Sequence, residues 1–380
     1  MKLSVIILNY NVRYFLQPCI QSVQEAMKNI NAEIIVADND SSDDSCEMVQ
    51  QEFPDVKLLP FKENHGFAKA NNLAVQEAKG EYILILNPDT IVAHDTLDKI
   101  LSYAEEKSNF GILGVRLIDG NGVFLPECKR GVPTAYVSME RLLGLKIRGK
   151  GKYYADHLKP HETGEVDILV GAFMLMKKNV YQEVGGFDEQ YFMYGEDIDL
   201  SYKVLKAGYN NFYYSDTSTI HFKGESTTKD LKYLSHFTNA MKIFYKNHFK
   251  KNPISNFIMF STIKVWYKIK RPGIKDVVQS AELPKNVLYI GKDEKLLASL
   301  KRKYTDVNFY QTDQVIAVAS FVKEKDVQEV IFDNNVIDYG TIVDQINKYS
   351  GRITFKMRPA HSNYIFGSNS SQSKGVVITF

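Results

Sequence analysis

The sequence predicts an α/β protein with a largely parallel sheet, followed by a second, smaller α/β unit. Three observations support this prediction. In the first hundred residues, short apolar runs alternate with segments of helical spacing. The runs are apolar throughout, as are strands that helices cover on both faces. Polar residues directly follow three of the runs, and open parallel sheets bind their ligands at that end of the strands.

The N-terminal elements follow from this alternation. Apolar runs predict strands over 3–8, 34–37, 56–61 and 82–86, and helical spacing predicts helices over 14–27, 45–53 and 68–79. Gly80 is expected to end the third helix, because glycine readily adopts the left-handed conformation that follows many helices. Strands joined by such helices run parallel.

Residues 110–250 are less regular. Strands are predicted over 110–117, 167–176 and 211–214, and a helix over 196–206. His221 is expected on the loop after the last of these strands. Residues 128–165 are rich in Gly, Lys, Arg and Tyr without clear periodicity. Such a pattern is typical of a long insertion that covers a site or contacts a substrate.

A basic segment spans residues 241–275, with nine Lys and Arg residues and no Asp or Glu. Large apolar side chains, among them Phe244, Phe249 and Trp266, are interleaved with the basic ones. Two interpretations are favoured: contact with a membrane surface, or a helix that packs on the first domain with its lysines in solvent. Contact with nucleic acid is a third, disfavoured because no other nucleic-acid motif is present. The most apolar part, residues 254–267, is too short to span a bilayer.

A second series of elements begins after Pro284. Strands are predicted over 286–290, 307–310, 329–333 and 353–357, with helices over 295–303, 322–329 and 339–349. This series predicts a small Rossmann-like domain. Only Gly291 stands where a G-x-G-x-x-G motif needs three glycines, so dinucleotide binding is not supported. Residues 361–375 are rich in Ser, Asn and Gly and are expected to be loose. The predicted domains are 1–240, 241–280 and 281–380.

Composition excludes several classes of protein. The chain has 380 residues, of which 44% are hydrophobic and 24% charged, as is ordinary for a globular protein. Its 47 basic and 45 acidic residues give a net charge of +2, which does not favour nucleic acid as a partner. The cysteines Cys19, Cys46 and Cys128 are too far apart for a zinc knuckle. Their odd number favours a reducing cytosol over a disulfide scaffold.

Two acidic groups carry the candidate chemistry. Asp89, in Asn87-Pro88-Asp89, follows the most hydrophobic strand, where a carboxylate can bind a divalent cation that bridges two phosphates. Glu196 and Asp197 begin a predicted helix, whose N-terminus favours their ionised form, while apolar surroundings and their mutual repulsion raise their pKa. A general base exploits this conflict. The simpler explanations are a turn in the first case and helix capping in the second. His221 is either structural or a Mn²⁺ ligand.

These motifs together resemble the inverting family 2 glycosyltransferases with a GT-A fold, most strongly their rhamnosyltransferase and galactofuranosyltransferase-like branch. SVIILNYN is similar to the family's first strand and nucleotide-binding loop, and IIVADNDSSDDS to its VDN-x-S-x-D motif. Asn64-His65-Gly66-Phe67-Ala68, with Ala70-Asn71-Asn72, resembles N-x-G-F…A-N-N, and Asn87-Pro88-Asp89 stands at the DXD position. GGFDEQYFMYGEDIDLSYKVLKAGY resembles the acceptor-side motif. The likeness covers about residues 1–250.

The resemblance implies a mixed, Rossmann-like GT-A sheet and a transfer reaction. A sugar would move from a nucleoside diphosphate to an acceptor hydroxyl with inversion, with Asp197 as the base and Glu196 as the second choice. Asp89 and His221 would hold Mg²⁺ or Mn²⁺, with Asn87 in place of the first Asp of DXD. The implied donor-binding residues are Asn9, Asn11, Asp38, Asn39, Asp40, Asn64, Gly66, Phe67, Asn72 and Asn87.

The resemblance also implies the partners of the reaction. They are a dTDP- or UDP-sugar and a lipid-linked glycan acceptor, with no nucleic acid, in the cytoplasm or at the inner face of the cytoplasmic membrane. Such transfer is typical of the assembly of bacterial surface polysaccharides of the O-antigen or capsule kind. Two alternatives stay open. A nucleotidyltransferase is disfavoured because SVIILNYNVRYF contains no glycine. A non-catalytic sugar-nucleotide sensor is disfavoured because Asp89, Asp197 and His221 are present.

Overall fold

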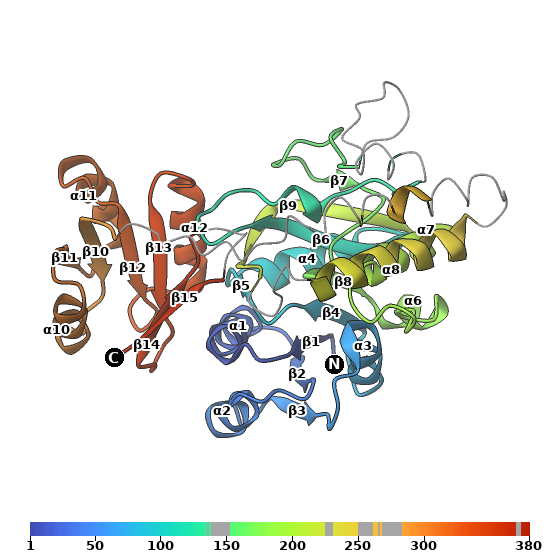
Figure 1. Ribbon diagram of the computed structural model, residues 1–380, viewed down its shortest axis with the longest axis horizontal. Coiled ribbons are helices and arrows are strands. Elements are labelled where there is room, and N and C mark those ends of the chain that lie inside the picture. The colour runs from blue at the N-terminus through green and yellow to red at the C-terminus, as the bar shows by residue number, and fades with distance from the viewer. Residues whose placement is uncertain are drawn as a thin grey trace.

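Two β-sheets stand next to each other in the protein, and the helix α12 (Tyr339–Lys348) lies where they meet (Figure 1). The computed structural model describes residues 1–134, 137, 153–224, 231–249, 261–264, 267, 283–369 and 374–380. Each sheet carries its own helices, so the chain is an α/β protein, as predicted.

The first sheet contains nine described strands in the order β3-β2-β1-β4-β8-β6-β9-β5, with β7 paired to β9. Their bounds are β1 Leu3–Asn9, β2 Ala32–Asp38, β3 Lys57–Pro60, β4 Tyr82–Leu86, β5 Thr90–Val92, β6 Phe110–Ile118, β7 Gly164–Glu165, β8 Phe173–Lys177 and β9 Asn210–His221. The first four strands along the chain pair in parallel, whereas β8 runs antiparallel between β4 and β6. The sheet is therefore mixed.

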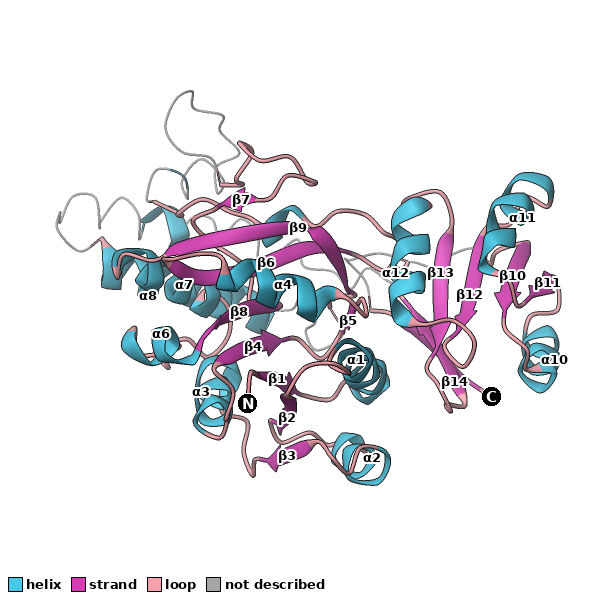
Figure 2. Cartoon of the chain, turned by 180° about the vertical axis from the view of Figure 1, so that it is seen from behind, coloured by secondary structure: helices cyan, strands magenta, loops and turns pink. Residues whose placement is uncertain are grey.

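Helices cover the parallel part of this sheet on both faces, with α1 and α2 on one side and α3 on the other (Figures 1 and 2). The helices of this unit are α1 Arg13–Ala26, α2 Ser45–Glu52, α3 Gly66–Gln76, α4 Thr96–Glu105, α6 Lys178–Glu183, α7 Glu196–Lys206 and α8 Leu231–His248. Every residue of β1 and β4 is buried, which explains why polar and apolar residues do not alternate along these strands.

Two predictions about strands in this unit are wrong. Of residues 167–176 only the last four belong to a strand, β8 (Phe173–Lys177), although Ile168 and Leu169 are fully buried. An apolar run reveals burial, and burial alone does not distinguish a strand from a covered loop. His221 is not on a loop: it ends β9 and pairs with Thr90 of β5. β5 has three residues and is too short to be recognised from the sequence.

Gly80 also differs from its prediction. The helix α3 ends at Gln76, four residues earlier, and Gly80 does not have a positive φ. Its amide donates a hydrogen bond to Oγ of Ser4 (2.8 Å), and a Cβ at this position would lie 2.4 Å from the backbone nitrogen of Ser4. Glycine is required here because the chain passes close to β1, not because a helix ends.

The second sheet has the strand order β11-β10-β12-β13-β14-β15. The bounds are β10 Asn286–Ile290, β11 Asn308–Thr312, β12 Glu329–Asp333, β13 Thr354–Arg358, β14 Tyr364–Gly367 and β15 Val376–Thr379, with helices α10 Glu294–Lys303, α11 Val318–Glu324 and α12. The first four strands in this list are parallel, as a Rossmann-like unit requires, and the last two are antiparallel. The expectation of a loose segment over 361–375 is wrong for β14, whose four residues are all buried.

One apolar cluster joins the two sheets. The rings of Phe15 in α1, Phe222 after β9 and Phe366 in β14 contact one another edge-on, with centroids 5.2–5.3 Å apart. Polar contacts surround the rings: the Tyr339 hydroxyl donates to Gln21 (2.8 Å) and the Tyr364 hydroxyl to Gln17 (2.9 Å). The second sheet therefore completes a core that the first sheet begins. The domain limits themselves stay a prediction, since residues 250–260 and 268–282 lie outside the described residues.

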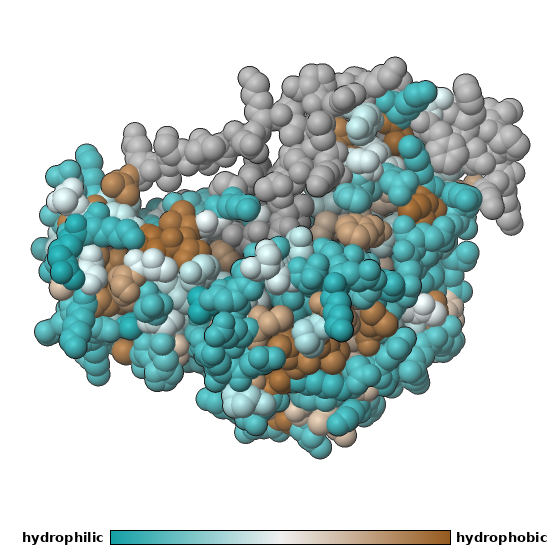
Figure 3. Space-filling view, turned by 60° about the horizontal axis from the view of Figure 1, so that its bottom comes forward, coloured by the Kyte–Doolittle hydropathy of each residue, from teal (hydrophilic) through white to brown (hydrophobic). Residues whose placement is uncertain are grey.

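The first part of the basic segment is described as part of α8. Phe244 is buried there against Tyr202 of α7, while Lys242 and Lys246 are exposed. In this part the helix packs on the first domain with two of its lysines in solvent. Most of the remaining segment lies outside the described residues, so both interpretations of the segment stay predictions. Among the described residues no helix is long and apolar enough to cross a bilayer. Seen from below, their surface is mainly hydrophilic with separate hydrophobic patches (Figure 3).

The shared core generates a prediction about stability. Phe366→Ala removes a fully buried ring that contacts both Phe15 and Phe222, so we expect the free energy of unfolding to fall by about 3–5 kcal/mol. Chemical denaturation followed by circular dichroism measures this loss. Phe380→Ala, at a partly exposed C-terminal ring, is the control and should cost far less. A loss below about 1 kcal/mol for Phe366→Ala would contradict the shared core.

Candidate active site

The first polar cluster lies at the carboxyl ends of β1 and β2, where Asn9 and Asp38 are register partners. Nδ2 of Asn9 donates to Oδ2 of Asp38 (2.7 Å) and to Oγ of Ser41 (3.1 Å), and the Ser41 amide donates to Oδ1 of Asp38 (2.9 Å). Both side chains are buried, and Oδ1 of Asn9 has no hydrogen-bond partner among the described residues. A buried acceptor without a partner is costly unless a ligand supplies a donor.

Asn11 and Asp40 shape the loops that follow these strands. Both have positive φ angles, 56° and 68°, which Asn and Asp tolerate better than other side chains. Oδ1 of Asn11 accepts hydrogen bonds from the amides of Ser42 (2.7 Å) and Asp43 (3.3 Å). The loops after β1 and β2 therefore hold each other, and Asp40 stays exposed at their surface.

Asn39 and Asn64 tie this cluster to the start of α3. Nδ2 of Asn39 donates to Oδ1 of Asn64 (3.0 Å), which also accepts from the amide of Gly66 (2.9 Å). Gly66 has φ +75°, and a Cβ there would lie 2.5 Å from the carbonyl oxygen of Phe192. That oxygen accepts a hydrogen bond from the Phe67 amide (2.8 Å). A glycine is needed because α3 begins in contact with the loop that precedes α7.

Asn72 is fully engaged within the protein. Its Nδ2 donates to the carbonyl of Phe187 (2.9 Å) and to Glu189 (3.0 Å), while its Oδ1 accepts from the Tyr181 hydroxyl (2.5 Å) and the Phe187 amide (3.0 Å). The side chain therefore fastens α3 to the Gly-Gly-Phe turn before α7. A donor molecule would have to displace one of these bonds to contact it.

Asn87, Asp89 and His221 meet at the end of β9. Nε2 of His221 lies 3.3 Å from Oδ1 of Asp89 and 3.3 Å from Nδ2 of Asn87. Asp89 and His221 are buried, and the backbone carbonyl of Asp89 accepts from the Phe222 amide (3.0 Å). In the described part of the chain, no three His, Cys, Asp or Glu side chains form a metal site. The third group beside Asp89 and His221 is the Asn87 amide.

Asp197 is held at the N-terminus of α7 by three donors. Its Oδ2 accepts from the guanidinium of Arg130 (2.7 Å) and the amide of Gly171 (3.1 Å), and its Oδ1 accepts from the amide of Ile198 (2.8 Å). Arg130 is itself buried and donates to the carbonyl of Leu169 (2.9 Å). The ion pair fixes the orientation of the Asp197 carboxylate.

Glu196 differs sharply from its neighbour. Its carboxyl group is buried, and Oε2 has no hydrogen-bond partner among the described residues. Burial, and then the charge of Asp197, raise the pKa of Glu196 to about 8. At neutral pH Glu196 is therefore mainly protonated, whereas Asp197 pairs with the Arg130 guanidinium, and the two carboxyl groups are pushed towards different roles.

The segment Gly171–Ala172 connects the two acidic groups. The backbone amide of Gly171 donates to Asp197, and the backbone carbonyl of Ala172 accepts a hydrogen bond from the backbone amide of Asn87 (3.0 Å). The ring of Phe67 also lies beside Gly171, because a Cβ there would be 3.5 Å from Cζ of Phe67 and 3.4 Å from Cβ of Asp197. Residues from the donor-side and acceptor-side motifs thus converge on one short segment.

Sequence analysis missed Arg130 and Gly171 as parts of this group. Arg130 lies in the irregular insertion of residues 128–165, whose basic composition was the only signal. Its partner Asp197 is 67 residues away, so local patterns do not reveal the pair.

Comparisons with known proteins identify a family and several relatives of this chain. The family model described as glycosyl transferase family 2 matches residues 4–185, and the model described as N-terminal domain of galactosyltransferase matches residues 153–229. The N-acetylglucosaminyl-diphospho-decaprenol L-rhamnosyltransferase of Mycobacterium tuberculosis (strain CDC 1551 / Oshkosh) is 30% identical over 211 residues, which cover 52% of this chain and 68% of that protein.

Two further similarities extend the comparison. The rhamnosyltransferase WbbL of Escherichia coli (strain K12) is 28% identical over 244 residues, which cover 60% of this chain and 86% of that protein. Among solved structures, residues 1–349 of TarS from S. aureus share 17% identity with a TM-score of 0.45, covering 74% of this chain and 76% of that one.

Glu196 generates a prediction about the pH dependence of stability. Its pKa is 4.5 in an ordinary environment and about 8 in the folded chain, so the folded state keeps a proton that the unfolded state loses between these values. The contribution of Glu196 to stability is therefore greatest below pH 4.5, falls by up to about 1.4 kcal/mol per pH unit as the pH rises to 8, and then levels off.

Glu196→Gln removes this pH-dependent contribution to stability, because glutamine does not ionise. We expect its free energy of unfolding to rise relative to wild type from pH 5 to pH 8, as measured by urea denaturation. Glu106→Gln, at an exposed residue after α4, is the control and should follow wild type. A constant difference between Glu196→Gln and wild type at every pH would show that Glu196 ionises normally.

Proposed function

This chain belongs to glycosyl transferase family 2 and is therefore a glycosyltransferase, and we propose that it transfers a sugar from a nucleoside diphosphate to an acceptor hydroxyl with inversion at the anomeric carbon. The single observation that carries the proposal is the Asp197 carboxylate, held in place by hydrogen bonds from Arg130 and the Gly171 amide. The next residue, Ala172, accepts a backbone hydrogen bond from Asn87, which lies beside Asp89 in the proposed metal site. A base beside a diphosphate site is what inverting transfer requires.

Asp197 is the proposed general base. An ionised carboxylate has about four positions at which it can accept hydrogen bonds. Three are used by Arg130, Gly171 and Ile198, so one remains for the acceptor hydroxyl. The hydroxyl oxygen attacks the anomeric carbon as its proton moves to Asp197, and the nucleoside diphosphate leaves on the opposite face. Glu196 is protonated at neutral pH, so it is the second choice for the base.

The donor would lie over the carboxyl ends of β1, β2 and β4. Asp38 would accept from the nucleotide base, and Asn9 and Asn11 would lie near the nucleoside. The buried Oδ1 of Asn9 supports this, because it has no partner among the described residues. Asn39, Asp40, Asn64, Gly66, Phe67, Asn72 and Asn87 complete the proposed donor side. A dTDP- or UDP-sugar is the proposed donor.

The side chains around Asp89 suit a hard divalent cation as metal ligands. Nε2 of His221 lies 3.3 Å from the buried Asp89 carboxylate and 3.3 Å from Nδ2 of Asn87, so a carboxylate, an imidazole and a side-chain amide gather at one place. Oxygen and nitrogen ligands of these kinds are accepted by Mg²⁺ or Mn²⁺. Asp89 and His221 would hold the ion, with Asn87 presenting its amide oxygen. When bound, such an ion neutralises charge on a diphosphate leaving group.

The proposed acceptor is a lipid-linked glycan, in the assembly of a bacterial surface polysaccharide. The name of the mycobacterial relative, a transferase acting on a diphospho-decaprenol, supports this class of acceptor. We propose that the protein works in the cytoplasm, in peripheral contact with the inner face of the membrane, where such acceptors lie.

Asp197→Asn tests the base. We expect it to lower kcat by at least about a hundredfold, because the amide accepts no proton, while nucleotide affinity stays within about twofold. The assay follows release of UDP or dTDP from a panel of donors in the presence of a lipid-linked acceptor. Glu196→Gln is the matched comparison and should lower kcat by less than Asp197→Asn does. A larger loss for Glu196→Gln would assign the base to Glu196, and equal full activity of both variants would refute the mechanism.

Asp89→Ala tests the donor site by calorimetric titration with UDP, dTDP and GDP, with and without Mn²⁺. We expect one nucleotide to bind wild type in the presence of Mn²⁺, and Asp89→Ala to weaken this binding by at least about tenfold, since a metal ligand is lost. Asp98→Ala, at an exposed residue of α4, is the control. If folded wild type binds none of the nucleotides, the proposed donor site is refuted. If nucleotide affinity is the same with and without Mn²⁺, the proposed role of the metal is refuted.

A further inference from the structure

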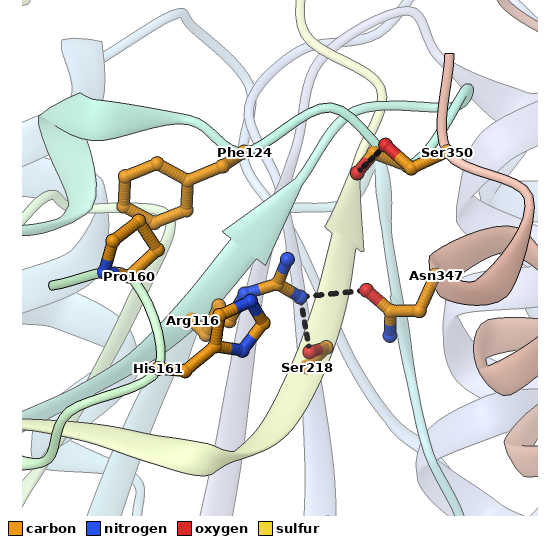
Figure 4. A pocket seen from close by; sticks show the side chains of 8 residues that line it. Arg116, Phe124, Pro160, His161, Ser218, Asn347 and Ser350 are labelled. Carbon is orange, nitrogen blue, oxygen red and sulfur yellow. Dashed lines mark hydrogen bonds between the residues drawn. The ribbon is translucent and has the colours of Figure 1, made fainter. Parts of the chain in front are cut away.

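A cavity of about 410 Å³ lies between the two sheets, away from the proposed active site. Arg116, Phe124 and Ser218 line it from the first unit and Asn347 and Ser350 from the second, with Gly122, Pro160 and His161 completing the wall. Figure 4 shows the Arg116 guanidinium among these residues, with Phe124, Pro160 and His161 on one side and Asn347 and Ser350 on the other. The cavity is far larger than a single water, whose share of liquid volume is about 30 Å³.

Arg116 is the unusual member of this group. It is 7% exposed, yet no acidic side chain of the described residues forms an ion pair with it. One terminal nitrogen donates to Oγ of Ser218 (2.8 Å) and Oδ1 of Asn347 (2.6 Å), both neutral, and the buried Nε has no partner among the described residues. Burial lowers the pKa of Arg116, and only Tyr213 and Cys128 oppose this. A buried guanidinium stays charged and is costly without an anion.

A second buried cation stands close by. Lys129 is 4% exposed and donates to the backbone carbonyls of Ala155 (2.9 Å) and Leu158 (2.8 Å), not to a carboxylate. Its Nζ lies 5.8 Å from the ring centre of Phe124, and Cζ of Arg116 lies 5.9 Å from the same ring. Two positive charges therefore flank one aromatic side chain of the cavity wall, and the local potential favours an anion.

The backbone is arranged to aim Arg116 into this space. The pairing of β6 with β9 shifts register between Val115 and Arg116: Val115 pairs with Tyr214, but Arg116 pairs with Ser218. Such irregularities re-aim a side chain out of the regular alternation of a strand. Here the irregularity brings Arg116 beside Ser218 and towards α12 of the second sheet.

We propose that this cavity binds a small phosphate ester, with the phosphate on Arg116 and the organic part against Phe124 and Pro160. The planar guanidinium suits two oxygens of one phosphate group. The Ser218 hydroxyl and the Asn347 side-chain amide offer hydrogen bonds to further oxygens, whereas the Ser350 hydroxyl already donates to the carbonyl of Gly122 (2.7 Å). The volume accommodates a ring as well as a phosphate. The inference is independent of the proposed function, because none of these residues belongs to the proposed active site.

A phosphate ester bound in this cavity would contact residues of both units. Arg116 and Ser218 belong to the first sheet and Asn347 to α12 of the second, so one ligand would contact both. Binding to the folded chain alone raises its thermal stability in a saturable manner. The expected observation is therefore a ligand-dependent rise in Tm.

The experiment is a thermal-unfolding titration of the full chain with inorganic phosphate, glucose 1-phosphate and acetate, at constant ionic strength and with EDTA present. We expect both phosphates to raise Tm saturably and acetate to have no effect. Arg116→Gln should weaken the apparent phosphate affinity by at least about tenfold, because a charge-assisted hydrogen bond is lost. His161→Ala changes an exposed residue of the wall, folds regardless, and should weaken the glucose 1-phosphate response.

Two control variants separate this site from others. Arg302→Gln, at an exposed arginine of α10, and Asp89→Ala, in the proposed donor site, should both respond as wild type does. The proposal is overturned if wild type does not respond to either phosphate, if acetate acts as strongly, or if Arg116→Gln responds like wild type. A response lost in Asp89→Ala and kept in Arg116→Gln would assign phosphate binding to the donor site and also overturn it.

Discussion

The buried ion pair between Arg130 and Asp197 is the interaction on which the arrangement of the candidate site depends. Arg130 also exchanges two backbone hydrogen bonds with Ile168, so the pair fastens the insertion, the segment 168–171 and the start of α7 to one another. Removing either partner would leave a charge buried without compensation, which costs several kcal/mol. The pair therefore does two things at once: it supports the fold locally and orients one carboxylate beside a protonated one.

The contrast between Asp197 and Glu196 follows from position alone. Both are acidic, adjacent and buried at the same helix N-terminus. Successive residues of a helix point about 100° apart, so only Asp197 meets Arg130 and the Gly171 amide. Glu196 has a buried oxygen without a partner and a pKa of about 8. A pair of identical functional groups is thus differentiated by what each one faces.

Much of the first sheet could be predicted from the sequence because β1, β2 and β4 are buried on both faces and follow one another closely. Their ends bring Asn9 and Asp38 together for the same reason: register partners of parallel strands finish at one edge. His221 was placed wrongly because β9 continues to pair with β5, a strand of three residues. Arg130 and Arg116 could not be predicted, since their partners Asp197 and Asn347 are 67 and 231 residues away. Long-range pairs leave no periodic signal.

The shared aromatic core has a consequence for how such chains can evolve. Phe15, Ile220 and Phe222 belong to the first unit but are buried partly by Phe366 and its neighbours in the second. A gene rearrangement that removed the second sheet would expose these side chains to water and favour aggregation. A family member without that sheet must therefore carry polar residues at these three positions or cover them with another element. The second sheet and the surface it covers are therefore coupled, and a change in one requires a matching change in the other.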